Sequence, residues 1–368
     1  MGDKMTKKML YCASTVSHIL NFHVPYLQAF HEMGYEVWVA ADKETPVPYA
    51  DHVIALPFRK KITSPENIRA VFAAVKLMRE QKFDFVSTHT MLASAVVRAA
   101  VLLLYKKPKV ACTVHGYLFH EEDGIRKWIY LLPEKLLAHI TNILMVMNHE
   151  DYEIAQKHKL YKDNLYYIDG MGIDLGQFKP ATHGEHNSAR KTRGILEDEF
   201  VYVYAAEFSK RKNQEFLIRA FADICKENPR MKLFLAGSGA LLSHCKELAH
   251  QLGTDQRIRF LGYVKDMRNL YAACDACVSV SRIEGLPFNL MEAMACGLPV
   301  IASDIKGHRE LAEKGGALFR QGDSVDLERE MLAVFSHPED FREKQDLSQF
   351  GIETVLPQIL KIYREAGL

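Results

Sequence analysis

Short apolar runs alternate along the first half of the chain with longer segments in which apolar residues recur at helical spacing. The short runs, which predict buried strands, are MLYCAST, YEVWVAAD, FDFVST and KVACTVHG. The longer segments, which predict helices, are PYLQAFHEMG, NIRAVFAAVKLMREQK and MLASAVVRAAVLLLY. Strands that alternate with helices of this length indicate parallel βαβ units, and uniformly apolar strands indicate a sheet covered on both faces. The pattern therefore predicts an α/β fold with a doubly wound parallel sheet.

The alternation stops over residues 170–194, a polar stretch rich in Gly, Lys, Arg and His that predicts a linker. A second run of strands and helices follows, from FVYVYAA to LPVIAS, and GIETVLPQILKIYREAGL predicts a last helix. We therefore expect two Rossmann-like domains, residues 1–178 and 179–348, and a C-terminal helix over 349–368. Ligands bind at the carboxyl ends of the strands in such sheets, so two such domains facing each other would enclose a cleft.

Two acids stand close together in the segment SRIEGLPFNLMEAMACGLPV. Glu284 falls in the loop at the carboxyl end of a strand, and Glu292 falls in the helix that follows. Pro287 suits the first turn of that helix and Gly297 the position past its end. The helix N-terminus favours an anion, whereas carboxylates accept hydrogen bonds from sugar hydroxyls. A ligand that carries both phosphates and sugars, such as a nucleotide-sugar, satisfies both features.

Positive charge for a diphosphate is present at another strand end. Lys210, Arg211 and Lys212 follow the first strand of the second domain. Gly237 and Gly239 follow the next strand, where the backbone could approach a ligand closely. As a dinucleotide fingerprint this glycine pattern is weak, because Leu242 replaces the third glycine, and a tight turn explains it equally well.

The segment EGLPFNLMEAMACGLPVIASDIKGHRELAEKGG resembles the signature of family 4 glycosyltransferases, which are retaining enzymes with the two-domain GT-B fold. The hallmark is a pair of glutamates separated by seven residues, here Glu284 and Glu292. The similarity continues through AEFSKRKNQEFLIRAF, MKLFLAGSG, RIRFLGYVKDMRNLYAACD and GMGIDLGQFKP. In the first half, STHTMLASAVVRAA, TVHGYLFH and NHEDYEIAQ resemble the exopolysaccharide and capsule branch of the family. Nearly the whole chain is covered.

The resemblance implies a role for each matching residue. Glu292 would bind the nucleotide ribose, Glu284 the donor sugar and Lys212 the diphosphate, while His115 would lie near the donor sugar and the acceptor. Glu284, His115 and Lys212 are thus the expected catalytic residues. The other expected donor-binding residues are Lys210, Arg211, Gly237, Gly239, Gly262, Tyr263, Val264, Gly285, Leu286 and Pro287. The expected acceptor-side residues are Ser14, Thr15, His89 and Gly116. The first domain would then serve the acceptor and the second the nucleotide-sugar, with the final helix crossing back to the first domain.

The sequence departs from the family pattern at three places. Glu207 stands where many members have an arginine that pairs with the lysine, and Lys210 or Arg211 could substitute for it. The first loop, CASTVSHILNF, has no glycine, so Ser14 and Thr15 could offer N–H and hydroxyl groups instead. Met91 replaces the proline of an HTP motif.

Charge and composition limit the kinds of binding partner that the sequence predicts. The net charge of +1 gives no support for nucleic-acid binding. The segment from Arg59 to Lys109 is strongly basic, and it could meet anionic lipid or a phosphate-bearing substrate, or be a solvated helix face. With seven cysteines, no signal peptide and no apolar run that could span a bilayer, we expect a cytoplasmic protein, with any contact at the inner membrane face peripheral.

Metal-binding motifs are absent from the sequence. Cys274 and Cys277 have no second cysteine pair, the sixteen histidines show no ligand spacing such as HExxH, and there is no Asp-x-Asp. We therefore expect no metal and no cofactor besides the donor substrate. The resulting expectation is transfer of a sugar, from a UDP-sugar or next from GDP-mannose, to a glycan or a polyprenyl-diphosphate-linked glycan. A GT-B nucleotide-sugar epimerase and a non-catalytic sugar-binding protein are the alternatives, and transfer to an added acceptor distinguishes them.

Overall fold

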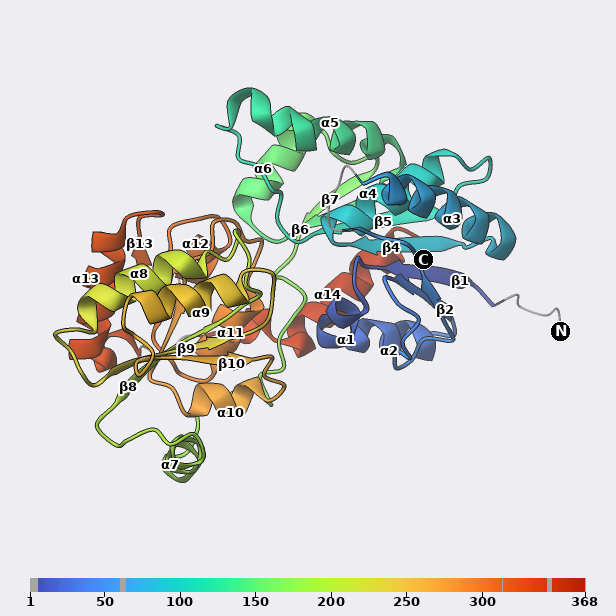
Figure 1. Cartoon of the computed structure of the whole chain (residues 1–368). Coiled ribbons are helices and arrows are strands. Elements are labelled where there is room, and N and C mark those ends of the chain that lie inside the picture. Colours follow the sequence, from blue (N-terminus) through green and yellow to red (C-terminus); the bar gives the residue numbers. More distant parts are fainter. Residues whose placement is uncertain (1–5, 60–63, 313, 343–345, 368) are drawn as a thin grey trace. The chain divides into compact units, whose positions relative to one another are not determined.

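The computed structural model describes residues 6–59, 64–312, 314–342 and 346–367 (Figure 1). The chain divides into two compact units. The first unit consists of Met1–Met171 and Val355–Leu368, and the second consists of Gly172–Thr354. The chain thus passes between units after Met171 and after Thr354, whereas the sequence analysis places these points after residues 178 and 348.

The first unit contains a seven-stranded sheet in the order β3-β2-β1-β4-β5-β6-β7, and every strand pair is parallel. The strands are β1 Lys8–Cys12, β2 Glu36–Ala41, β3 His52–Ala55, β4 Phe85–His89, β5 Lys109–Val114, β6 Ile143–Val146 and β7 Asn164–Tyr167. The main helices are α1 Val16–Phe22, α2 Val24–Glu32, α3 Pro65–Gln81, α4 Met91–Leu102, α5 Trp128–Leu137, α6 His149–His158 and α14 Ile352–Glu365. Small side chains such as Ala74 and Ala100 let α3 and α4 pack together over the buried strands.

The second unit contains a six-stranded parallel sheet in the order β10-β9-β8-β11-β12-β13. The strands are β8 Phe200–Ala205, β9 Met231–Ala236, β10 Ile258–Gly262, β11 Ala276–Ser279, β12 Val300–Ser303 and β13 Ala317–Phe319. The helices are α7 His183–Thr192, α8 Gln214–Ile224, α9 Leu242–Gln251, α10 Met267–Ala272, α11 Phe288–Ala295, α12 His308–Ala312 and α13 Ser324–Ser336. The Tyr202 hydroxyl donates to the Met331 carbonyl at 2.6 Å and so fixes α13 to the central strand β8.

Both sheets have the same topology, and this confirms the predicted doubly wound architecture. In each unit the first strand pairs with the second on one side and with the fourth on the other. The strand order reverses between β1 and β4 in the first unit and between β8 and β11 in the second. The crevice at the carboxyl ends of such a strand pair is where doubly wound sheets bind ligands. The loops after these four strands are therefore where functional side chains are expected.

Two segments that the sequence analysis treats as irregular form helices. The stretch predicted as a linker contains α7, where the Thr182 side chain accepts from the Glu185 N–H and the Glu185 carboxylate accepts from the Thr182 N–H. The loop after β1 contains α1, because the Thr15 hydroxyl accepts from the His18 N–H at 3.3 Å and caps the helix. Side-chain caps of this kind stabilise helix starts in segments with few apolar residues.

The later part of α14 belongs to the first unit. The Tyr363 ring lies 5.3 Å from the ring of Phe30 and 5.3 Å from that of Phe85. The Tyr363 hydroxyl also lies 3.0 Å from Ser87 Oγ on β4. The C-terminal segment thus helps to form the interior beneath the carboxyl end of β4.

Candidate functional site

The carboxylate of Glu284 is held by two cations at the point where strand order reverses in the second unit. Glu284 follows β11 and is 7% exposed, while Arg211 and Lys212 follow β8. The Lys212 ammonium donates to Glu284 Oε1, and Arg211 Nη1 donates to Glu284 Oε2 at 3.0 Å. Because β8 and β11 are neighbours, the sheet itself brings these side chains together. We call Arg211, Lys212 and Glu284 the charged cluster.

The cations determine the charge of Glu284. Burial alone would raise the pKa of this carboxyl, but the Lys212 ammonium and the Arg211 guanidinium outweigh burial and lower the pKa to about 2. Burial lowers the pKa of Lys212, and the charge of Glu284 opposes that shift. Near neutral pH the charged cluster therefore presents an ionised carboxylate whose two oxygens each face a cation.

Close backbone packing holds the Glu284 loop in place. Gly307 has φ +74°, and a Cβ atom on it would lie 2.2 Å from the Gly285 carbonyl oxygen, so no larger residue fits there. The Tyr204 hydroxyl donates to the Lys212 carbonyl at 2.9 Å and lies 2.8 Å from Ser281 Oγ. These contacts fix both loops of the charged cluster without using its side chains.

Glu292 lies in a different environment from Glu284. It is half-buried on α11, where its Oε2 accepts a hydrogen bond of 3.4 Å from the Tyr271 hydroxyl. The same hydroxyl donates to the Asn289 carbonyl at 3.1 Å. Burial raises the pKa of Glu292 to about 7, and the bond from Tyr271 only partly opposes this shift. The two acids of the motif therefore differ in charge state because one has cationic partners and the other is desolvated.

The helix between the two acids has nearly the expected limits. Pro287 is the N-cap of α11, one position earlier than the expected first turn. Gly297 follows the C-cap and has φ +79°, as the sequence predicts. Gly285 and Leu286 complete the loop that leads from Glu284 into the helix.

The glycines after β9 are needed for packing between loops. A Cβ atom on Gly237 would lie 2.0 Å from the Ala206 carbonyl oxygen, and one on Gly239 would lie 2.4 Å from the Phe208 carbonyl oxygen. The Gly237 N–H also donates to the Gly262 carbonyl at 2.6 Å. The loops after β8, β9 and β10 are therefore joined at one edge of the sheet. The donor-binding role of Gly237, Gly239 and Gly262 stays a prediction.

The remaining expected donor residues, Lys210, Tyr263 and Val264, lie in the loops after β8 and β10. Lys210 is exposed and, with Arg282, lines a cavity of about 290 Å³ at the start of α8. Thus, of the two residues expected to replace the family arginine, Arg211 is the one that reaches Glu284. Tyr263, 71% exposed, and half-buried Val264 follow β10, where a base could stack on the tyrosine ring.

The corresponding strand ends of the first unit carry polar and aromatic groups. Ser14, after β1, is joined to Thr90, after β4, by a hydrogen bond of 2.5 Å between their hydroxyl oxygens. His115 and Gly116, with φ +102°, follow β5. His115 Nε2 lies 3.4 Å from Nδ1 of His89, the buried last residue of β4.

A chain of polar groups continues from His89 into the interior. His89 Nε2 lies 3.0 Å from Ser87 Oγ, and Ser87 Oγ lies 3.0 Å from the Tyr363 hydroxyl of α14. Burial lowers the pKa of His89 and of His115 well below the usual value, so both imidazoles are neutral near pH 7. A neutral imidazole can accept a hydrogen bond from a hydroxyl group.

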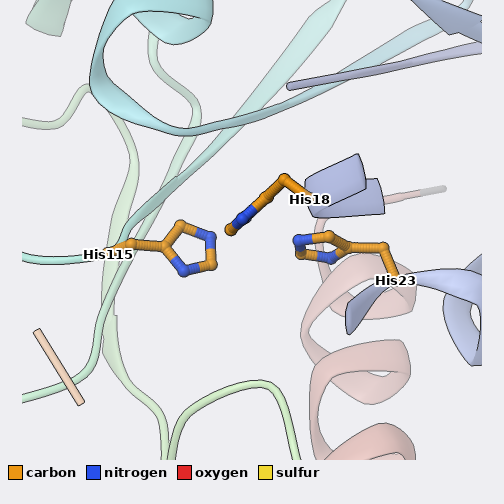
Figure 2. Close-up of side chains that lie close together, drawn as sticks. All are labelled: His18, His23 and His115. Atoms are coloured by element: carbon orange, nitrogen blue, oxygen red, sulfur yellow. The ribbon is translucent and has the colours of Figure 1, made fainter. Parts of the chain in front are cut away.

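Three further histidines lie near functional groups and are not among the residues predicted from the sequence. In the second unit, buried His308 lies 3.2 Å from Ser279 Oγ, with its Nδ1 2.8 Å from the Ser303 carbonyl oxygen. In the first unit, His18 of α1 and His23, between α1 and α2, lie beside His115 (Figure 2). Their H-x4-H spacing falls within that of the histidine pair in zinc-finger patterns, but no cysteine pair precedes them to complete such a motif. A second signal is that both fall in the first loop, where a glycine-rich turn is expected.

Comparison with known proteins identifies the family of the chain. Residues 186–352 match the family described as glycosyl transferases group 1, and residues 8–147 match the glycosyl transferase 4-like family. EpsD of Bacillus subtilis, which is named as a glycosyltransferase, is 34% identical over 356 residues, covering 96% of this chain and 93% of EpsD. A UDP-Gal:alpha-D-GlcNAc-diphosphoundecaprenol alpha-1,3-galactosyltransferase of Escherichia coli is 29% identical, covering 69% of this chain and 66% of that enzyme.

The fold also matches solved structures. HepE of Anabaena, solved with UDP and glucose, has a TM-score of 0.76 and 19% identity, and the match covers 97% of this chain and 99% of HepE. At that identity the likeness establishes the fold alone, while the likeness to EpsD along nearly the whole chain establishes the family. The chain therefore belongs to the group 1 and family 4-like glycosyltransferases and is a GT-B glycosyltransferase.

Proposed function

We propose that this glycosyltransferase moves a sugar from a UDP-sugar to a lipid-linked glycan, with retention of anomeric configuration, in exopolysaccharide or capsule synthesis. The observation that carries the proposal is the charged cluster, in which Lys212 and Arg211 keep Glu284 ionised at the strand-order reversal of the second sheet. An ionised carboxylate between cations offers acceptors for sugar hydroxyls beside donors for a diphosphate.

The donor assignment rests on Glu292 and on the relatives. Glu292 lies on α11 beyond the charged cluster, where it can accept hydrogen bonds from the two ribose hydroxyls of a nucleotide. The name of the Escherichia coli relative specifies UDP-Gal, and HepE is solved with UDP. Both favour uridine as the base, while GDP-mannose remains the next donor to test.

In the proposed transfer, the bond between the anomeric carbon and the diphosphate breaks as the acceptor hydroxyl bonds to that carbon. Negative charge grows on the leaving diphosphate, and Lys212, Arg211 and the backbone N–H groups at the start of α11 stabilise it. Both oxygens of Glu284 already interact with cations, which makes its carboxylate a poor nucleophile. This supports attack on the donor by the acceptor itself, with Glu284 holding the donor sugar. We expect donor binding to need no divalent metal.

His115 is the proposed group for the acceptor. As a neutral imidazole it can orient the acceptor hydroxyl and take part in removal of its proton. Ser14 and Thr15 stay predictions as acceptor contacts, since Ser14 bonds to Thr90 and Thr15 caps α1 in this structure.

We also propose that the first unit meets an anionic membrane surface. Among the described residues, no helix has the length and apolarity to cross a bilayer. One face of the segment that ends in α5 is nevertheless apolar and exposed: Ile125, Trp128, Ile129, Leu132 and Leu136. Exposed Arg126 lies on the same segment, and Lys135 Nζ lies 5.8 Å from the Trp128 ring centroid. Apolar and basic side chains on one helix favour the interface of an anionic bilayer.

The structure corrects one part of the basic-segment prediction. Arg98 is fully buried, where it donates to both oxygens of Glu134 at 2.7 and 2.8 Å, so it is not part of a basic surface. Lys60 and Lys61 lie outside the described residues. Lys106 and Lys107 are exposed after α4, which packs against α5.

A nucleotide screen followed by a transfer assay tests the proposal. Thermal unfolding is followed with UDP, GDP, ADP and dTDP and their sugars, in wild type and in Glu292→Ala. We expect the largest stabilisation with a UDP-sugar and its loss in the variant; a ligand at about 100 times its Kd stabilises by about 2.7 kcal/mol. The active donor is then incubated with a polyprenyl-diphosphate sugar, and the anomeric configuration of the product is read by proton NMR.

Three results would contradict parts of the proposal. An inverted product excludes retention, and stabilisation by GDP-mannose alone excludes a UDP-sugar. Conversion of the donor without any transfer to the acceptor indicates an epimerase instead.

A further inference from the structure

Three imidazoles converge in the first unit at the carboxyl edge of its sheet (Figure 2). His18 comes from α1, His23 from the junction of α1 and α2, and His115 from the loop after β5. One ring nitrogen of each lies within 4.8 Å of one ring nitrogen of the other two. The ring centroids are 4.9 Å apart for His18 and His23 and 5.0 Å apart for His18 and His115.

We propose that His18, His23 and His115 form a binding site for a divalent transition metal, with Zn²⁺ as the best fit. Three nitrogen ligands with no carboxylate among them suit zinc, cobalt, nickel or copper rather than magnesium or calcium. A tetrahedral zinc with bonds of about 2.0–2.1 Å separates its nitrogen ligands by roughly 3.4 Å. Small side-chain movements therefore close the observed arrangement around an ion.

Two of the three histidines have a buried ring nitrogen without a hydrogen-bond partner in the part of the chain that the structure describes. Nε2 of His18 and Nε2 of His23 are buried, and neither has a hydrogen-bond partner among the described residues. A buried polar atom without a partner is uncommon and indicates an ion or a water molecule at the site.

The surroundings already orient one of the ligands. His23 Nδ1 lies 2.8 Å from the Tyr11 hydroxyl oxygen, so a proton on Nδ1 can be donated to that oxygen and Nε2 is left free to bind the ion. The Tyr11 ring also stacks on His89 with centroids 4.5 Å apart. Metal-bound histidines commonly have such a second partner, which fixes the tautomer and the ring orientation.

The site goes beyond sugar transfer and is distinct from a metal that bridges a donor diphosphate. All three ligands belong to the first unit, whereas the groups proposed for the diphosphate belong to the second. Three protein ligands leave a fourth tetrahedral position open, as in zinc sites that take water or a substrate oxygen. An ion bound through His115 would occupy a nitrogen that the proposed acceptor role also uses. The test is therefore made on binding, so that its outcome is independent of transferase activity.

Cobalt is the spectroscopic probe for this test. The full-length chain, stripped of metal with a chelator, is titrated with Co²⁺ and the bound ion is then displaced with Zn²⁺. We expect one equivalent to bind with the intense visible absorption of a tetrahedral site, and Zn²⁺ to abolish that absorption. His18→Ala is the main variant, because its Nε2 has no partner to lose among the described residues. His115→Ala is the second variant, and exposed His139→Ala in the same unit is the matched control.

Each ligand variant should lose more affinity for Co²⁺ than the roughly 10–100-fold that follows loss of an outer-shell partner, while His139→Ala binds like wild type. Circular dichroism checks that both ligand variants are folded. The proposal is overturned if wild type shows no saturable tetrahedral spectrum, in which case water alone fills the site. It is equally overturned if both folded ligand variants keep wild-type affinity, because the ion then binds elsewhere among the sixteen histidines.

Discussion

The two units have the same sheet topology but hold different titratable groups at the carboxyl ends of their strands. In the second unit, Lys212 and Arg211 keep the buried carboxylate of Glu284 charged. In the first unit, burial without a counter-charge keeps the imidazoles of His89 and His115 neutral. The carboxylate of Glu284 keeps its charge because cations pair with it, whereas burial keeps the two imidazoles uncharged.

The two units also differ in how many large apolar side chains their surfaces expose. Large exposed apolar side chains are concentrated in the first unit, above all along α5 and the residues just before it. Among the described residues of the second unit they are limited to Leu196, Tyr263 and Val325. This difference favours a division of labour in which the second unit binds a charged, water-soluble donor and the first deals with an amphipathic acceptor.

The largest expected effect comes from removing a cation of the charged cluster. For Lys212→Met we expect kcat to fall about 100-fold or more, the usual effect of losing one group that stabilises developing negative charge. Steady-state transfer assays on variants checked for folding measure this. Lys210→Met is the comparison, because Lys210 is exposed and it is Arg211 that pairs with Glu284. Equal losses in the two variants would contradict the assignment of the diphosphate to the charged cluster.

The second effect concerns stability and its dependence on pH. Glu284→Gln leaves Lys212 without its carboxylate, and losing one partner of such a pair should lower the free energy of unfolding by about 3 kcal/mol near pH 7. The folded pKa of about 2 lies below the unfolded value of about 4.3, so the carboxylate stabilises the fold above pH 4.3. That contribution is lost as the pH falls through about 2.

Urea unfolding of wild type and Glu284→Gln across this pH range checks the prediction. The difference between the two proteins should shrink between about pH 4.3 and pH 2. A difference that stays constant with pH would mean that the ion pairs do not set the charge of Glu284.

Much of this comparison could be predicted from the sequence. Apolar runs gave the order of strands and helices, because uniformly apolar strands occur where both faces of a sheet are covered. Glu284 and Glu292 could be placed because Pro287 and Gly297 mark the limits of α11. The family resemblance added their roles, which no spacing rule contains.

Other features depend on side-chain direction and on tertiary contacts. The sequence could not decide whether Lys210 or Arg211 replaces the family arginine. The choice depends on the direction in which the backbone of the loop points each side chain. His18 and His23 come close together because α1 ends and α2 begins at His23. No periodic pattern in the sequence predicts that helix boundary. Arg98 appeared to be a surface charge because its partner Glu134 is far away in the sequence.

A smaller effect tests the difference between the two surfaces. Ile129→Glu and Leu132→Glu should each weaken binding to vesicles of anionic phospholipid at least about tenfold. Burying one such side chain in an apolar phase contributes about 1.5–3 kcal/mol, and 1.4 kcal/mol is tenfold. Sedimentation with the vesicles measures the partition. Leu196→Glu is the matched control, because the exposed fraction of this leucine of the second unit lies between those of Leu132 and Ile129. If the control loses as much binding as the α5 variants, or if none loses any, the first unit is not the membrane surface.

The smallest expected effect is a pH dependence of donor affinity that comes from Glu292 and not from Glu284. Glu292 has a pKa of about 7 because it is desolvated, whereas Glu284 at about 2 stays ionised throughout the range from pH 6 to pH 8. If the ionised form of Glu292 binds the ribose hydroxyls, the affinity for a UDP-sugar should rise about tenfold between pH 6 and pH 8. A UDP-sugar is used rather than UDP, because its diphosphate diester has no proton to lose in this range. Calorimetric titration of wild type should show this rise, and Glu292→Gln should show an affinity that does not change with pH. If the variant instead keeps the wild-type pH dependence, another group causes that dependence and Glu292 does not contact the ribose.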